Sequence, residues 1–183
     1  MTGFGAYNRY FGKLSDGSVK IRGIAARRHV TPEFVRSMQG RMLEVMASAA
    51  TIAELEDKKE EIRNIFLETV KSLPAADPKV IVINCRISRL TYTHRCIEGA
   101  AVHVYQKHGV GIAPGMKIRY VVTDARRYRV EPELNAAAFD LHYFRNLLEK
   151  AWEEIAFAFR TDPLEKNTQN QELCDARKAT LCQ

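Results

Sequence analysis

Apolar and polar residues alternate near the start of the chain, and this pattern predicts a β-hairpin. In a run over residues 18–24, Val19 and Ile21 fall on one face and basic residues fall on the other. A second run over 7–14 precedes it, with Asp16-Gly17 between the two. Because glycine accepts the positive φ that a tight turn requires, Asp-Gly between two such runs favours a hairpin.

Three later stretches carry apolar residues at the spacing of an amphipathic helix. The first opens at Thr31-Pro32, where we expect Thr31 as the N-cap and Pro32 at the first helical position. The second opens at Thr51-Ile52-Ala53-Glu54, which has the form of a capping box, and ends before Pro74. The third begins after Asp140, which we expect to cap it. We expect their apolar stripes to form a core.

The segments between these helices are shorter. Residues 80–83 are all apolar and predict a short strand or a buried segment, residues 97–108 have helical character, and residues 116–122 predict a strand. Residues 164–183 are polar, and we interpret them as a tail. Helices together with a hairpin and a few further strands indicate an α+β fold.

The composition excludes several classes of protein. A chain of 183 residues with 46% hydrophobic residues suits one globular domain, and it contains no apolar run long enough to span a membrane. Its cysteines form no C-x-x-C pair, and its histidines lack metal-site spacing, so we expect neither a disulfide framework nor a zinc site. The N-terminus lacks the pattern of a secretory signal, and we therefore expect a cytoplasmic protein.

Charge is sorted by segment along the chain. Residues 1–50 carry eight Lys or Arg against three Asp or Glu, and residues 79–130 carry ten against two. The segments 51–78 and 131–183 are net acidic, by −3 and −4. Two basic blocks favour a polyanionic partner, because cations near phosphates release condensed counterions. Solvated basic faces are the simpler alternative.

Short motifs within the basic blocks are more specific than their charge. The first group comprises Tyr7-Asn8-Arg9-Tyr10, the Asp16-Gly17 turn, and Arg22-Gly23-Ile24 with Arg27-Arg28. Three more motifs follow in this order: Ile87-Ser88-Arg89, Gly109-Val110-x-Ile112-x-Pro114-Gly115-Met116, and Phe139-Asp140-x-x-Tyr143-Phe144. This succession resembles the C-terminal palm-tail and thumb region of archaeal family B DNA polymerases, over residues 7–160.

The resemblance implies a division of the chain and a role. Residues 1–30 would form the palm-tail hairpin, 31–163 a mostly helical thumb with a short strand region near 116–122, and 164–183 the tail. The thumb of such a polymerase grips primer–template duplex DNA without sequence preference. The residues expected to contact DNA are Arg9, Tyr10, Arg27, Arg28, Arg86, Arg89, Arg95, Lys117 and Arg119. For the cluster of Arg126, Arg127 and Arg129, solvation is the simpler explanation.

The sequence departs from the family in ways that bear on activity. Asn8 stands where the family has a lysine, and the motifs that carry its catalytic carboxylates do not occur in the chain. We therefore expect no cofactor on this chain, with Mg²⁺ required only by the complete polymerase, and no polymerase activity without a palm-and-fingers polypeptide. The acidic runs over 54–61 and 149–154 are expected to point to solvent.

Other interpretations stay open from the sequence. The chain is either a thumb portion or subunit of a polymerase, or a stand-alone, non-catalytic nucleic-acid-binding protein derived from one. A small enzyme that uses the histidines is a third possibility. The family often ends in a peptide with paired aromatic residues that binds a sliding clamp. Leu181 is present here without those rings, so we expect no clamp binding through the tail.

Overall fold

A two-stranded hairpin opens the part of the chain that the computed structural model describes, which is residues 10–14, 16–28, 30–156 and 158. Strand β1 (Tyr10–Lys13) pairs antiparallel with β2 (Val19–Arg22). Gly17 in the turn has a φ of 84°, the left-handed conformation that Asp-Gly predicts. The hairpin is thereby confirmed. Arg9 and the tail at 164–183 lie outside the described residues.

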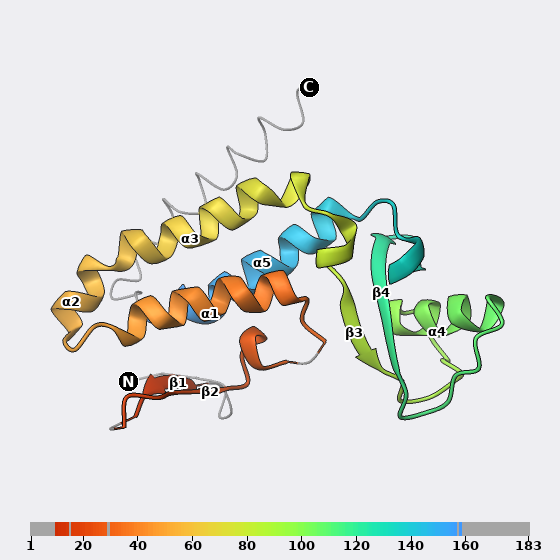
Figure 1. The fold of residues 1–183 in the computed structure, drawn as a ribbon, viewed down its shortest axis with the longest axis horizontal. Coiled ribbons are helices and arrows are strands. Elements are labelled where there is room, and N and C mark those ends of the chain that lie inside the picture. The colour runs from red at the N-terminus through yellow and green to blue at the C-terminus, as the bar shows by residue number, and fades with distance from the viewer. Residues whose placement is uncertain (1–9, 15, 29, 157, 159–183) are drawn as a thin grey trace.

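Three long helices each pack against the other two (Figure 1) and form what we call the helical layer: α1 (Glu33–Ala47), α3 (Lys59–Ser72) and α5 (Leu141–Ala156). The apolar stripes meet between them, where Met42, Ile62 and Leu148 are fully buried. None of the described helices is long and apolar enough to cross a membrane.

The helix starts follow the predicted caps with two differences. The Thr51 hydroxyl accepts the Glu54 backbone N–H at 3.2 Å and begins the short helix α2 (Ile52–Asp57). The chain then turns at Lys58 into α3, so the predicted second helix is two helices. Helix α1 begins after Pro32, which is its N-cap, so Thr31 is not the cap. Pro32 takes an extended ψ of 149° there, and its carbonyl accepts the first helical N–H groups.

A small antiparallel sheet lies beside the helical layer, with its strands in the order β3-β4-β5. These are β3 (Ile83–Arg86), β4 (Lys117–Asp124) and β5 (Arg129–Pro132), and helix α4 (Ile97–Lys107) packs against β4 and β5. Strand β3 begins at the end of the predicted 80–83 run. The remaining short elements are the 3-10 turns η1 (Ala25–Arg27), η2 (Leu73–Ala75), η3 (Pro78–Val80) and η4 (Glu133–Asn135).

Asp140 joins the sheet to the helical layer. One oxygen of its carboxylate accepts the Tyr143 N–H at 2.9 Å and caps α5, as predicted. The other accepts the Ala125 N–H at 2.8 Å, and the Asp140 N–H donates to the Val122 carbonyl at 2.8 Å. The start of α5 is therefore hydrogen-bonded directly to the end of β4. The α+β fold is confirmed.

A buried polar cluster joins the chain beyond the hairpin to the helices. Glu154 of α5 accepts the Ala25 N–H at 2.7 Å and the Gln39 side-chain amide at 3.2 Å, and it pairs with Arg28. Gln39 is fully buried and also donates to the Ala151 carbonyl at 2.9 Å. The Glu154 side chain is only 9% exposed, so the prediction that the 149–154 carboxylates point to solvent is wrong here. Its partners lie far away in sequence, on η1 and α1.

Candidate nucleic-acid interface

The outer face of the hairpin carries the first group of predicted contacts. The register places Tyr10 opposite Arg22 and Gly12 opposite Lys20, and all of these are exposed, while Phe11 and Ile21 turn toward the core. The Lys20 ammonium lies 6.0 Å from the centre of the Tyr10 ring. Hydrogen bonding by Arg22, with the charge of Lys20, holds the pKa of Tyr10 below its usual value. We call Tyr10, Lys20 and Arg22 the hairpin face.

Arg27 and Arg28 follow the hairpin and differ in their partners. Arg28 donates to the Gly23 carbonyl at 3.2 Å and forms an ion pair with Glu154. Its charge is therefore already balanced by a carboxylate of α5. Arg27 is exposed at the end of η1, and within the described part of the chain it makes no ion pair. Of the two, Arg27 is the one whose charge is available to a ligand.

Three further predicted cations lie together on one face of the sheet. Arg86 of β3 stands directly opposite Lys117 of β4, and Arg119 follows on the same side of β4. The intervening positions, Cys85 and Ile118, are buried. This alternation exposes all three cations, which we call the sheet face. Arg119 pairs with Glu133 at 2.8 Å, whereas Arg86 and Lys117 form no ion pair among the described residues.

The guanidinium of Arg86 is held in place by the neighbouring loop. Its Nε–H donates to the Gly115 carbonyl at 3.1 Å. Gly115 in turn donates its N–H to the Ile87 carbonyl at 2.7 Å, and its φ is 92°. A Gly at this position suits the left-handed backbone. The Pro-Gly-Met segment of the sequence therefore positions an arginine of the sheet face.

Arg89 and Arg95 lie on the loop between β3 and α4. Arg89 lies over the Tyr92 ring, with 5.4 Å from its guanidinium carbon to the ring centre. The Tyr92 hydroxyl donates to Glu98 at 2.6 Å, and Ser88 donates to the same oxygen at 3.1 Å. Burial, with the neighbouring Glu98, raises the pKa of Tyr92. Glu98 therefore ties the loop to the first turn of α4 and fixes where Arg89 stands.

The predicted cations form two groups and not one compact site. The hairpin packs through β2 against α1, whereas β4 and β5 of the sheet pack with α4, and Glu98 of α4 is hydrogen-bonded to the 87–96 loop. Figure 1 shows the hairpin below α1 and the sheet at the other end of the helical layer. Sequence reasoning left Lys20 and Arg22 out of the predicted contacts, although their alternation with Val19 and Ile21 places them beside Tyr10.

The described residues offer little for metal or nucleophilic chemistry. Among them, no group of three or more His, Cys, Asp or Glu side chains is placed to hold a metal ion. Burial, with the nearby Glu98, raises the pKa of Cys85 to about 11. A buried cysteine of this kind stays protonated and is a poor nucleophile and metal ligand. Cys85 is therefore a core residue of the sheet.

Comparison with solved structures shows a similar fold in a DNA polymerase. The family B DNA polymerase from the hyperthermophilic archaeon Pyrobaculum calidifontis superposes with a TM-score of 0.64 and 21% sequence identity. The chain has the fold of part of this polymerase. The match covers 83% of this chain but only 20% of the polymerase. No protein-family model matches the sequence, and no curated protein matches it.

Proposed function

We propose that the chain is the C-terminal, thumb portion or subunit of a family B DNA-directed DNA polymerase. In this role it grips primer–template duplex DNA by its phosphates and without sequence preference. The polymerase-like fold and the order of the sequence motifs support the assignment of the region. The observation that carries the DNA-binding role is the sheet face, where Arg86 and Lys117 stand opposite each other without a carboxylate between them.

This arrangement costs stability in the absence of a ligand. Like charges directly opposite on neighbouring antiparallel strands are destabilising by a few tenths to about 1 kcal/mol. A phosphate that lies over both side chains removes the repulsion and releases its counterions. Charge placed against folding stability in this way favours a role in binding a polyanion over a merely solvated surface.

The chemistry of the exposed cations suits a grip that ignores base sequence. Arginine and lysine on strands and loops contact phosphate oxygens, which fix position but carry no sequence information. On both faces the side chains are held by the fold: Tyr10 by its cross-strand neighbours, and Arg86 by the Gly115 carbonyl. Side chains held in this way accept any duplex that presents phosphates at the right spacing.

Nucleotidyl transfer itself requires divalent ions held by carboxylates close to the primer end. In the proposed assembly these carboxylates and the Mg²⁺ belong to a separate palm-and-fingers polypeptide. This chain contributes the duplex grip and not the chemistry.

The test is the salt dependence of duplex binding by the full chain. Fluorescence anisotropy with a labelled blunt duplex should give weak binding whose log K falls against log salt with a slope of about −4 to −5, for about four to six neutralised phosphates. Duplexes of unrelated sequence should bind equally well. Binding that is independent of salt, or that selects one sequence, contradicts the proposal.

A further inference from the structure

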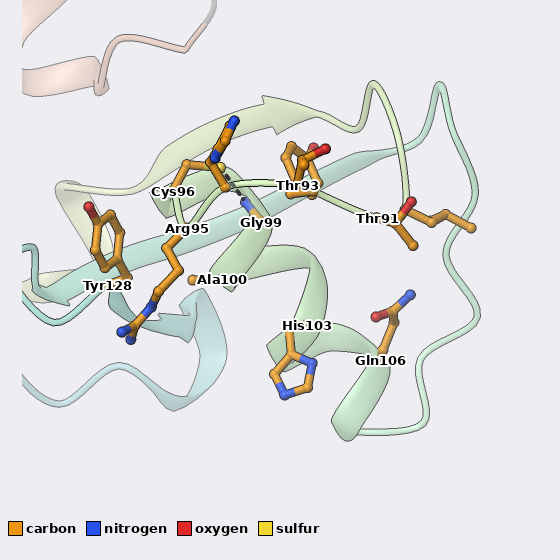
Figure 2. A pocket seen from close by; sticks show the side chains of 12 residues that line it. Thr91, Thr93, Arg95, Cys96, Gly99, Ala100, His103, Gln106 and Tyr128 are labelled. Carbon is orange, nitrogen blue, oxygen red and sulfur yellow. Dashed lines mark hydrogen bonds between the residues drawn. The ribbon is translucent and has the colours of Figure 1, made fainter.

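A pocket of about 550 Å³ lies between the 90–96 loop and α4, apart from the hairpin face and the sheet face. Figure 2 shows the loop residues Thr91, Thr93 and Arg95 with His103 and Gln106 of α4 around it. Its volume lies within the range of about 300–1,000 Å³ that is typical of small-ligand pockets. None of the residues that line it is acidic. His94 also lines the pocket.

One wall of the pocket is a stacked pair of side chains. The Arg95 guanidinium carbon lies 5.3 Å from the centre of the Tyr128 ring, and both residues line the pocket. Tyr128 belongs to the turn between β4 and β5 and has a φ of 56°. Among the described residues it is the one non-glycine residue with a positive φ. A strained backbone conformation at a bulky residue persists where the surroundings or a function require it.

These features select one kind of ligand. A site for phosphate alone would need cations, but it would need neither an aromatic wall nor a pocket of this volume. A duplex is a poor candidate as well, because its outer surface presents no free base that could enter a pocket. Arginine and aromatic planes stack on unpaired bases, and this stacking tolerates any base. Threonine hydroxyls and histidine imidazoles beside such a wall supply hydrogen bonds to the sugar and phosphate.

We propose that this pocket binds an unpaired nucleotide of a DNA strand, with its base on the Arg95–Tyr128 pair and its phosphate toward His103. The inference rests on the proposed function, because it assumes that the chain handles DNA. It adds a site for a single-stranded segment next to the surface that holds the duplex. The lining without carboxylates is what makes the pocket suitable for an anionic nucleotide.

The experiment compares two labelled probes on the full chain, an oligothymidylate of about eight nucleotides and a blunt duplex. Tyr128→Gly removes the ring and also relieves the positive φ, so the variant should fold at least as well as the parent. It should weaken oligothymidylate binding about tenfold through lost stacking. His103→Gln should weaken it about fivefold through a lost hydrogen bond. Both variants should leave blunt-duplex binding at the parent level.

His142→Gln is the matched control, because His142 is an exposed histidine on α5 that lies outside the pocket. It should change neither probe. Equal losses for both probes, or no loss of oligothymidylate binding in Tyr128→Gly, would overturn the pocket assignment. Displacement of the oligothymidylate by inorganic phosphate as readily as by thymidine monophosphate would also overturn it. A parent chain that fails to bind the blunt duplex contradicts the proposed function separately.

Discussion

Arg86 and Lys117 lie directly opposite each other on neighbouring strands, so their charges repel across the ladder. Arg119 stands on the same side of β4, but its charge is balanced by an ion pair with Glu133, with 2.8 Å between nitrogen and oxygen. The repulsion is therefore concentrated in one pair. A substitution at this pair can separate what the surface does for folding from what it does for binding.

The first prediction is that Lys117→Glu stabilises the protein and weakens its binding to duplex DNA. An opposite-charge pair across the strands should raise the free energy of unfolding by about 0.5–1 kcal/mol, measured by urea denaturation. The slope of log K against log salt should become shallower by about 1. Lys79→Glu, with the same charge change on η3, is the control and should alter the slope less. A destabilised variant with parent-like DNA binding would contradict the sheet-face assignment.

The second prediction concerns Glu154, which accepts hydrogen bonds from the Ala25 N–H and the Gln39 amide and pairs with Arg28. Glu154→Gln removes the negative charge and replaces one acceptor oxygen with a donor. The free energy of unfolding should fall by about 2–4 kcal/mol, because buried charges and donors lose their partners.

Glu153→Gln provides the matched control for this change, since Glu153 is the adjacent residue of α5 and is exposed. Its unfolding midpoint in urea should stay close to that of the parent. Equal midpoints for the two variants would show that the buried cluster contributes nothing.

The burial of Glu154 is a feature that the local sequence pattern does not predict. The other charged residues of the 149–154 run, Glu149, Lys150 and Glu153, are typical of a solvated helix face. One of the partners of Glu154, Gln39, lies 115 positions away in sequence. Only the packing of α1 on α5 brings the two together. By contrast, the Asp140 cap depends on the next three residues, and it was predictable for that reason.

At the scale of elements, two helix glycines have opposite surroundings. A Cβ at Gly99 in α4 would lie 2.9 Å from the Tyr92 ring, whereas a Cβ at Gly40 in α1 would meet nothing within 4 Å. The close approach at Gly99 lets Tyr92 reach Glu98 and so orders the loop that carries Arg89 and Arg95.

The third prediction follows from this contrast. Gly40→Ala should raise the free energy of unfolding by about 0.5–1 kcal/mol, since alanine is the better helix former. Gly99→Ala should lower it by about 1–3 kcal/mol, because the Tyr92 ring must move and overpacking outweighs helix propensity. Thermal unfolding of the two variants side by side checks this. Stabilisation by Gly99→Ala would mean that the Tyr92 loop adjusts freely.

The strands were harder to predict than the helices and the hairpin. Residues 80–83 are apolar because Ile81 and Val82 are buried, but pairing with β4 starts only at Ile83. Strand β5 consists of Arg129–Pro132, whose charged residues and terminal proline give no apolar alternation beyond Val130. Its position depends on pairing with Val122 of β4, which no local pattern encodes.

At the scale of the whole molecule, the two cationic surfaces lie on different parts of one continuous core, and the Asp140 hydrogen bonds link α5 to the end of β4. The fourth prediction is that the chain does not extend a primer alone. With primed template, the four nucleotides and Mg²⁺ it should give no product, because paired carboxylates for the metal ions are required.

Addition of the chain to a family B polymerase fragment that lacks its thumb should restore extension, measured on a sequencing gel. Lys117→Glu should restore less extension than the parent chain. Extension by the isolated chain that a carboxylate substitution abolishes would contradict the division of roles. Duplex binding without any restoration would instead favour the stand-alone nucleic-acid-binding protein.

The hydrogen bond from Ala25 to Glu154 spans 129 residues of sequence. During synthesis, the anchor for the segment after the hairpin is therefore not available until α5 has been made. At about 5–20 residues per second, that delay is on the order of ten seconds. Until then the segment has only its contacts with α1, which include the hydrogen bond from the Ala26 N–H to the Gln39 side chain, and Arg28 lacks its carboxylate partner. The order of translation thus sets when this part of the molecule matures.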